Sequence, residues 1–435
     1  MKALEAIERA ESLTVHGRVA QVVGIVIEGY GPVTSIGEVC EITREHGHGA
    51  VSAEVVGFRG ERVLLMPLGD TQGIGPGSRL ILKGHAARVP VGTALLGRIV
   101  NGLGEPLDGG GAIGCDQTYP LYAAPPDPLL RARITQPLDL GVRALNALLT
   151  CGIGQRLGIF ATSGVGKSVL LGMIGRYTAA DVNVIALIGE RGREVKEFLE
   201  RDLSPGALQR SVVVVATSDQ PPLVRIRAAL LATTIAEFFR DRGQRVLLMM
   251  DSLTRLAHSQ REIGLATGEP PTTKGYTPSV FALLPKLLER VGTCPGAGSI
   301  TGLYTVLADD ETLSDPIAES VRSILDGHIV LSRDLAARNH YPAIDILQSI
   351  SRVMRDIVAP EHFAAARRVV ELAAVYRRSE DLITIGAYKP GANAQLDKAA
   401  AVQEASNEFL RQEPGTRADW ASSIDALMRL EQVAR

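Results

Sequence analysis

The chain has 435 residues, which is enough for about three domains of ordinary size. The formal net charge of −2 gives no global basic field and argues against nucleic acid as the main partner. No apolar stretch approaches the length of a membrane span, and the N-terminus lacks the apolar region of a signal peptide, so we expect any membrane association to be peripheral or through partners. The cysteines show neither C-x-x-C pairing nor metal-ligand spacing, and we expect reduced thiols in a cytosolic protein; they are Cys40, Cys115, Cys151 and Cys294.

The first 88 residues have the pattern of a small β-barrel domain. Short apolar runs are separated by glycine-rich turns, and they lie at residues 19–27, 50–56, 62–66 and 79–83. Short strands at such close spacing predict a barrel. The alternative is an independent RNA-binding domain of the OB type, which is disfavoured because the strands lack interleaved aromatic and basic residues.

The most informative motif follows at residues 157–168, which read LGIFATSGVGKS. Residues 157–160 predict a short buried strand, and residues 169–174 form an apolar run at helical spacing. A phosphate-binding P-loop requires this order of strand, loop and helix. Gly164 and Gly166 let backbone N–H groups point at phosphates, next to the positive end of the new helix.

The side chains of this motif indicate a nucleoside triphosphate site. Lys167 is placed to reach the β- and γ-phosphates, and the Ser168 hydroxyl can bind Mg²⁺. Ala161 stands where the first glycine of the usual motif is found, and alanine fits there if its φ is negative. The alternative is a glycine-rich turn that only caps a helix. The predicted nucleotide contacts are Ala161, Thr162, Ser163, Gly164, Val165, Gly166, Lys167 and Ser168.

A second apolar strand at residues 182–188 ends in a charged segment, 189–194, which reads GERGRE. A carboxylate at the C-terminal tip of a central strand faces the crevice where open α/β sheets bind ligands. Glu190 is therefore a candidate to polarise the attacking water, and Arg191 a candidate to bind phosphate oxygens. The alternative is a surface charge cluster at the start of a helix.

A third strand at residues 245–250 ends in Asp251, as a Walker B strand does. Its carboxylate can hold Mg²⁺ through water. Arg255 lies about one turn along the following helix and is a further candidate to reach the phosphates. A strand at 212–216 and a helix at 223–240 complete the intervening units. This alternation predicts an α/β domain with a mostly parallel sheet and crossover helices, which we place at residues 89–355.

Longer segments resemble the α/β-subunit superfamily of rotary ATPases. They are residues 189–194, 261–271 (REIGLATGEPP), 278–281 (PSVF) and 342–351 (PAIDILQSIS). Within that superfamily the chain is most similar to the flagellar protein-export ATPases, whose nearest relatives are the ATPases of type III virulence secretion. That finer resemblance rests on residues 54–58 (EVVGF), 64–68 (LLMPL), 97–104 (GRIVNGLG) and 385–388 (IGAY). The resemblance runs from about residue 17 to the C-terminus.

This resemblance implies a ring-forming ATPase. Its N-terminal barrel, residues 1–88 here, forms a crown on the ring, and its substrate is ATP. Arg352 matches the arginine finger of the family, which reaches the γ-phosphate bound by the neighbouring subunit. Because one chain holds both Glu190 and Arg352, a homo-hexamer is sufficient, although catalytic chains of hetero-hexamers can keep both residues too. The alternative for Arg352 is an interface salt bridge without a catalytic role.

The C-terminal part, residues 356–435, predicts a small helical domain. Helical patterning covers residues 360–374, 396–409 and 420–432. Phe363 matches the position where family members stack an aromatic ring on adenine. The alternative is that Phe363 is an ordinary core aromatic of an amphipathic helix.

The function implied is ATP hydrolysis that energises flagellar type III export, by releasing and unfolding chaperone-bound substrates at the export gate. The alternatives are a virulence secretion ATPase, the catalytic subunit of a rotary ATP synthase, and a non-catalytic structural subunit. Glu190 argues against the last, because non-catalytic subunits of the superfamily lack a carboxylate there. Residues 417–420 (RADW) look more flagellar than virulence-associated.

The same resemblance implies the partners and the location. The partners are a regulatory stator protein, a central stalk protein, membrane proteins of the export gate and substrate–chaperone complexes, without nucleic acid. The location is the cytoplasm, peripherally at the inner membrane of the flagellar base. Flagellar relatives often carry a longer N-terminal arm that docks the stator protein. The helix predicted at residues 4–10 is either a reduced version of that arm or a segment that frays.

Overall fold

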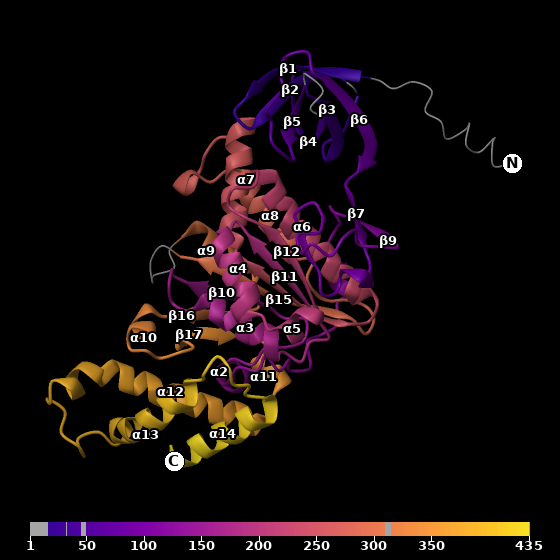
Figure 1. Cartoon of the computed structure of the whole chain (residues 1–435). Coiled ribbons are helices and arrows are strands. Elements are labelled where there is room, and N and C mark those ends of the chain that lie inside the picture. The colour runs from indigo at the N-terminus through magenta and orange to yellow at the C-terminus, as the bar shows by residue number, and fades with distance from the viewer. Residues whose placement is uncertain (1–15, 32, 45–48, 309–314, 435) are drawn as a thin grey trace.

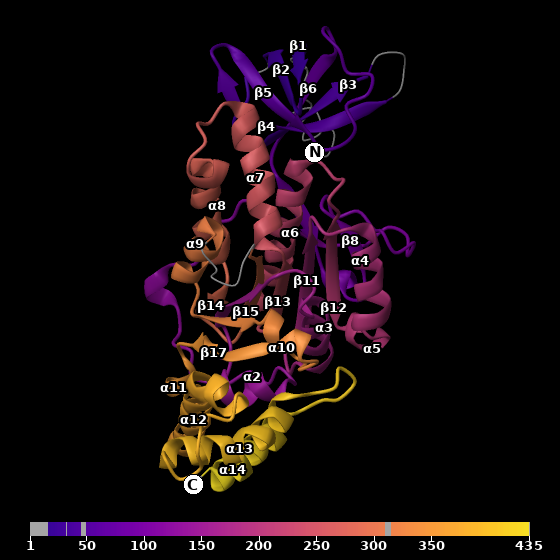
Figure 2. The same ribbon diagram turned by 90° about the vertical axis from the view of Figure 1, so that its left-hand side faces the viewer.

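The computed structural model describes residues 16–31, 33–44, 49–308 and 315–434, so the helix predicted at residues 4–10 lies outside the described residues. Three parts follow one another along the long axis of the molecule (Figures 1 and 2). A β-barrel lies at one end, an α/β unit in the middle and a bundle of helices at the other end. The predicted fold class is confirmed.

The barrel is closed by six antiparallel strands in the order β1-β2-β5-β4-β3-β6. Alternate side chains of these strands point inward and form a separate core that includes Ile27, Ile42 and Leu65. The strands are β1 (His16–Val23), β2 (Val26–Tyr30), β3 (Glu38–Thr43), β4 (Ala50–Arg59), β5 (Arg62–Pro67) and β6 (Arg79–Ala86).

The sequence pattern and the barrel differ at one strand. The apolar run at residues 19–27 predicts one strand, but the chain turns back within it. Gly24 takes a φ of 58°, a left-handed conformation that favours glycine, and Val23 pairs with Val26 across the hairpin. An apolar run continues through a tight hairpin when both arms face the same core, so hydrophobicity alone did not reveal the turn.

A buried polar cluster fixes the barrel to the α/β unit. Glu54 of β4 pairs with Arg227 of α6 (Pro222–Asp241), and the Tyr122 hydroxyl also donates to Glu54. Glu54 and Arg227 are both buried. A second contact runs from the Arg59 guanidinium to the Thr267 carbonyl oxygen, 3.5 Å away. The barrel therefore rests on the upper ends of α6 and of α7 (Leu253–Thr267) (Figure 2).

The middle part is built on a nine-stranded sheet of described residues, with the order β17-β16-β10-β15-β13-β11-β12-β8 and β14 paired beside β15. All pairs are parallel except those made by β14 and β17. The strands are β8 (Ile99–Asn101), β10 (Arg156–Ala161), β11 (Val182–Ile188), β12 (Ser211–Ala216), β13 (Arg245–Asp251), β14 (Gly292–Thr293), β15 (Ser299–Leu307), β16 (Gly327–Leu331) and β17 (Ile344–Ser351). A small ribbon of β7 (Arg88–Val91) and β9 (Gln117–Pro120) leads into it.

Helices cover both faces of this sheet, as a parallel sheet requires. One face packs on α6, α7 (Leu253–Thr267), α8 (Pro278–Leu288) and α9 (Pro316–Ile324). The other packs on α2 (Arg143–Leu148), α3 (Lys167–Tyr177), α4 (Gly192–Glu197) and α5 (Pro205–Gln209). Residues 222–239 of α6 are buried, and the charged side chains among them form ion pairs, as buried charges require.

The C-terminal helices pack against α2 at the end of the middle part that lies away from the barrel (Figure 1). They are α11 (Met354–Ile357), α12 (Pro360–Thr384), α13 (Ala394–Leu410) and α14 (Trp420–Val433), while the short α10 (Arg333–Ala337) connects β16 to β17. Their apolar stripes join the core of α2 and α3, with Val369, Phe409 and Leu427 among the buried residues. The side chain of His362 bonds the Ala147 carbonyl oxygen over 2.7 Å and ties α12 to α2.

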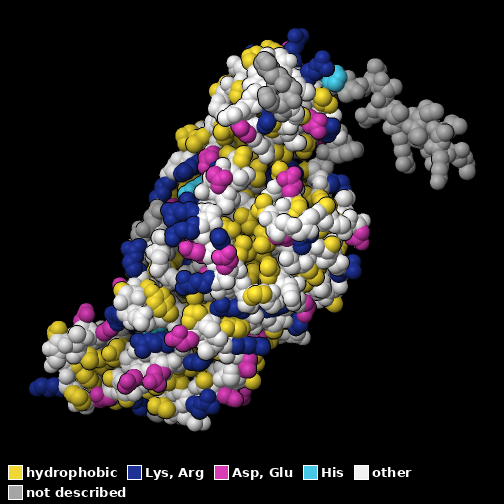
Figure 3. Space-filling view, in the orientation of Figure 1, with side chains coloured by type: hydrophobic (Ala, Val, Ile, Leu, Met, Phe, Trp, Pro, Cys, Tyr) yellow, Lys and Arg dark blue, Asp and Glu magenta, His cyan; other side chains and the backbone are white. Residues whose placement is uncertain are grey.

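The surface carries charges of both signs. Basic and acidic side chains are interspersed over the face seen in Figure 3, without a single-sign field. None of the helices described combines the length and apolarity needed to cross a bilayer.

Candidate active site

A P-loop joins the central strand β10 to α3. Ala161 is the last residue of β10 and pairs with Leu307 on one side and Leu331 on the other, so its backbone is extended. That conformation is open to alanine, which explains why no glycine is needed at the first position of the motif. Gly164 and Gly166 do require glycine, since their φ values are 83° and 89°.

The loop presents donors that a phosphate chain can use. Helix α3 begins at Lys167, and its first intrahelical bond runs from the Leu170 N–H to the Gly166 carbonyl oxygen, 3.0 Å away. The N–H groups before Leu170 therefore lack intrahelical acceptors and carry the positive end of the helix dipole. The Thr162 hydroxyl is buried and has no partner among the described residues. An anionic ligand fits this cradle.

Three charged side chains converge beside the loop. Lys167 pairs with Asp251 at the end of β13, and its Nζ lies 3.6 Å from Glu190 Oε1 at the end of β11. The Thr305 hydroxyl donates to Asp251 Oδ1 over 2.6 Å and orients that carboxylate. Strands β10, β11 and β13 are parallel, so their carboxyl ends bring these groups to one edge of the sheet.

The donor set suits a magnesium ion held together with a nucleotide. No group of three or more His, Cys, Asp or Glu side chains among the described residues could hold a metal by itself. Mg²⁺ usually takes one or two protein oxygens and completes its shell with phosphates and water. Ser168 on α3 and Asp251 offer one hydroxyl and one carboxylate, which matches that requirement.

Glu190 has the electrostatics of a general base. It is buried, and its Oε1 makes no hydrogen bond with any described residue. Burial raises the pKa of Glu190 to about 7; the Lys167 charge lowers it and the Asp251 charge raises it further. A base is most effective when its pKa lies near the working pH.

This pKa predicts a pH dependence. Only the ionised carboxylate accepts a proton, so kcat/KM for ATP should fall as the pH decreases through about 7. The measurement is a steady-state pH profile at low ATP. The residual activity of Glu190→Gln serves as the control. The pH profile of this variant retains the titration of ATP itself but should lack the decrease in kcat/KM that Glu190 causes. A flat wild-type profile between about pH 5.5 and about 8 would exclude Glu190 as the titrating base.

The two arginines predicted to bind phosphate differ in their placement. Arg255, in the first turn of α7, packs its side chain against Gly189, and its Nε is buried without a partner among the described residues. It is close enough to lower the pKa of Glu190. Arg191 is largely exposed and pairs with Glu194 at 2.9 Å. The structure thus brings Arg255 to the cluster and leaves Arg191 at its rim, and their catalytic roles stay predictions.

One aromatic residue beside the P-loop, Tyr341, was not predicted from the sequence. A Cβ placed on Gly166 would lie 3.3 Å from the Tyr341 ring, which is 39% exposed. Phe363 is partly buried against the core of α2 and the C-terminal helices, and its adenine-stacking role stays a prediction. Tyr341 directly precedes Pro342, the first residue of a segment that carries the family resemblance, and that position was the available signal.

Arg352 lies at the other end of the sheet. It directly follows β17, where Ser351 pairs with Gly327 at the start of β16, whereas the P-loop begins beyond the pair of Ala161 and Leu331. At about 3.3 Å per residue the two points are roughly 15 Å apart along the strands. Its exposed guanidinium makes no hydrogen bond or ion pair with the described residues.

Three family models match consecutive parts of the chain. The nucleotide-binding domain of the ATP synthase alpha/beta family matches residues 141–351, and the beta-barrel domain of that family matches residues 19–84. The T3SS EscN ATPase C-terminal domain matches residues 358–429. Each match falls on one of the three parts of the fold.

Similar proteins match over almost the full length. The chain is 52% identical to a flagellum-specific ATP synthase of Bacillus subtilis, covering 98% of both chains. It is 53% identical to a type 3 secretion system ATPase of Xanthomonas euvesicatoria, covering 95% of this chain and 93% of that one.

Solved structures agree with these matches. The assembled ATPase EscN from the type III secretion system of enteropathogenic E. coli superimposes with a TM-score of 0.90 at 48% identity, over 95% of this chain and all of that one. EscN in complex with its central stalk EscO superimposes with a TM-score of 0.88 at 48% identity, over 95% of this chain and all of that one. The chain therefore belongs to the ATP synthase alpha/beta family, in the branch of the flagellar and type III secretion ATPases.

Proposed function

We propose that this ATPase energises flagellar type III protein export as a homo-hexameric ring with shared active sites. One observation carries the proposal. Each chain holds a candidate base, Glu190, beside its own P-loop, and an arginine without an ion pair among the described residues, Arg352, at the opposite end of the sheet. In a head-to-tail ring these two ends meet at every interface, so every site is completed by the next subunit.

The chemistry follows from these positions. Lys167 and the N-terminal amides of α3 hold the β- and γ-phosphates, and Glu190 accepts a proton from the attacking water. Asp251 and Ser168 would hold Mg²⁺, which would neutralise phosphate charge. Arg352 of the neighbour stabilises the charge that develops on the γ-phosphate. Tyr341 offers a ring face for the adenine base.

Flagellar export is the assignment we favour over virulence secretion. The identities to the two kinds of relative are nearly equal, at 52% and 53%. The match to the Bacillus subtilis flagellum-specific protein covers 98% of both chains, and residues 417–420 (RADW) support the same assignment. The discriminating observation is whether deletion of the gene abolishes flagellar filaments; normal filaments would favour the virulence system.

The proposed partners follow from this assignment. They are a central stalk protein, as EscN has in EscO, together with a stator protein, export-gate membrane proteins and substrate–chaperone complexes. The proposed location is the cytoplasm, peripherally at the inner membrane of the flagellar base.

Subunit mixing tests the shared site directly. Arg352→Ala protomers keep Glu190, and Glu190→Gln protomers keep Arg352. At an interface that pairs the intact base of the first with the intact finger of the second, one complete site is rebuilt. In rings mixed one to one, about a quarter of the interfaces have this arrangement. We expect ATPase activity well above that of either variant alone.

The control is proof that subunits exchange, for example by co-purification of an untagged variant with a tagged one. If mixed rings form and no activity returns, Arg352 does not act across the interface and the shared-site mechanism is wrong.

A further inference from the structure

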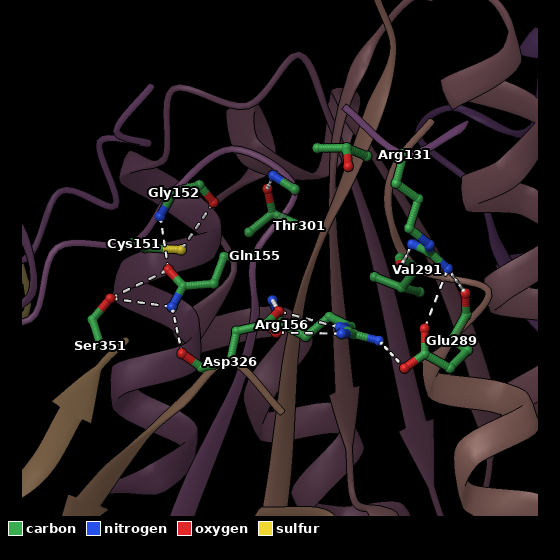
Figure 4. Close-up of polar contacts among 12 residues, drawn as sticks. Arg131, Cys151, Gly152, Gln155, Arg156, Glu289, Val291, Thr301, Asp326 and Ser351 are labelled. Carbon is green, nitrogen blue, oxygen red and sulfur yellow. Dashed lines mark hydrogen bonds and ion pairs between the residues drawn. The ribbon is translucent and has the colours of Figure 1, made fainter. Parts of the chain in front are cut away.

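The backbone that carries Arg352 is anchored on a partly buried polar network. The Arg352 N–H donates to the Asp326 carbonyl oxygen over 3.0 Å, just before β16 begins. The adjacent Ser351 donates its hydroxyl proton to the Thr150 carbonyl oxygen over 2.7 Å. Figure 4 shows Ser351 and Asp326 approached by the same side chain, that of Gln155.

Gln155 links these two anchors. Its Nε2 lies 3.0 Å from the Asp326 carbonyl oxygen and 3.1 Å from Ser351 Oγ, while its Oε1 accepts from the Gly152 N–H over 2.8 Å. Gln155 is fully buried. A buried amide with all of these bonds made has one orientation, so it fixes Ser351 and the Asp326 carbonyl group, both of which adjoin the Arg352 backbone.

Asp326 is in turn clamped by Arg156 at the start of β10. The Arg156 guanidinium donates to both carboxylate oxygens over 3.2 Å, and the Arg156 backbone N–H donates to Oδ2 over 3.0 Å. The Asp326 N–H donates back to the Arg156 carbonyl oxygen over 2.9 Å. Four bonds between two residues are a rigid connection, and the fork-shaped pairing adds directional specificity.

The clamp continues away from the finger to α8. Glu289, directly after α8, forms an ion pair with Arg156 at 2.6 Å, and Arg131 donates to the Val291 carbonyl oxygen over 2.9 Å (Figure 4). Strands β16 and β17 are closely packed here, because a Cβ on Gly327 would lie 2.4 Å from the Ile350 carbonyl oxygen.

A fixed backbone position matters for a long side chain that must reach another molecule. Arginine has several rotatable bonds, so an error at its Cα is carried to the guanidinium. A misplacement of about 1 Å can cost up to roughly 100-fold in rate. The network contacts the backbone of Arg352 and leaves its guanidinium free, so it fixes where the finger starts without neutralising it.

We infer that Asp326 and Arg156 are positioning residues for Arg352: they hold the finger in place for the nucleotide of the neighbouring subunit. This inference rests on the proposed shared site. It predicts that a change in the clamp affects catalysis at the neighbour's P-loop and leaves the variant's own nucleotide binding intact, because the P-loop lies at the other end of β10.

The first test is Asp326→Asn, which keeps the size of the side chain and removes the charge that binds both arms of Arg156. We expect kcat to fall about 10- to 100-fold with an unchanged dissociation constant for ATP. The chain offers a matched control, since Arg245 and Asp181 form the same four-bond pairing at the start of β13. Asp181→Asn loses an equivalent pairing that does not touch the finger, and its kcat should stay within about twofold of wild type.

The decisive test distinguishes whether the substitution impairs the variant's own P-loop or the Arg352 that it supplies to its neighbour. Asp326→Asn mixed with Glu190→Gln should form interfaces with an intact base and an intact finger, and its activity should exceed that of both parents. Asp326→Asn mixed with Arg352→Ala should never exceed Asp326→Asn alone, because no protomer then has an intact finger. A damaged fold or a damaged P-loop would not produce this difference between the two mixtures.

Arg156→Lys is the second variant, in case Asp326→Asn does not fold. Lysine keeps the charge and loses the planar pair of donors that binds both carboxylate oxygens. We therefore expect a smaller fall in kcat, and the same gain or absence of gain in activity in the two mixtures. The inference is overturned if either folded variant has wild-type kcat, or if its mixture with Glu190→Gln shows no gain while Arg352→Ala with Glu190→Gln does. If that reference mixture also fails, the shared site itself is wrong.

Discussion

Arg352→Ala should assemble and bind ATP normally yet lose turnover on the order of 10³-fold or more, by analogy with other arginine fingers. The reason is the position of Arg352, which is exposed, unpaired among the described residues and remote from its own P-loop. Its removal costs the folded subunit no ion pair within the described part of the chain, whereas the γ-phosphate of the neighbour loses a cation in the transition state. The measurements are steady-state kcat, nucleotide affinity and sedimentation of the ring.

Two further variants serve as a control and as a conservative substitution for this prediction. Arg355→Ala removes another exposed arginine three residues further along, on α11, and should leave kcat near wild type. Arg352→Lys keeps the charge but not the planar fork and should recover only part of the activity. Specific activity should also rise with protein concentration, since a lone subunit lacks the finger of its neighbour. Normal turnover of assembled Arg352→Ala would reduce Arg352 to an interface residue.

Glu190→Gln should retain ATP binding and lose turnover by roughly 10²–10⁴-fold, the range for loss of a positioned base. Glutamine keeps the shape of the side chain beside Lys167 but cannot accept the proton of the attacking water. Single-turnover ATP hydrolysis and binding of a fluorescent nucleotide would separate these two effects. Lys167→Ala should differ by losing affinity as well as turnover, because the ammonium binds the phosphates already in the ground state.

Glu197→Gln is the matched control for this result. Glu197 lies on α4 a few residues after Glu190, is exposed and pairs with Arg193 at 3.3 Å on the helix surface, so its substitution should change kcat by less than about twofold. Near-normal turnover of Glu190→Gln would instead mean that Glu190 is a carboxylate at a helix start without a catalytic role.

The nucleotide site was largely predictable from the sequence because its signals are local. A strand that ends in a glycine-rich turn and a lysine at a helix start produce the P-loop by backbone conformation alone, as the φ values of Gly164 and Gly166 show. An apolar strand ending in Asp251 is equally local. Parallel strands must bring their carboxyl ends to one edge of the sheet, so the strand pattern alone predicted that Glu190 and Asp251 lie close together.

Contacts between distant segments could not be predicted in this way. The position of Tyr341 beside Gly166 depends on β16 lying between β10 and β17, and the network of Gln155, Arg156 and Asp326 depends on the same arrangement. Each of these side chains has an ordinary sequence context, because no residue pattern records which strand becomes a neighbour.

The sequence by itself thus predicted a nucleoside triphosphate site, since that site is built from short segments with their own conformational signals, and hydrolysis followed from the family resemblance. The tertiary structure alone decided that Glu190, the candidate base, and Arg352, the candidate finger, lie at opposite ends of the sheet. The antiparallel return of β17 reverses the direction of the chain there and carries Arg352 away from its own P-loop. The physical reason is that strand order and direction come from the packing of the whole sheet, and they decide whether one subunit can complete its own site.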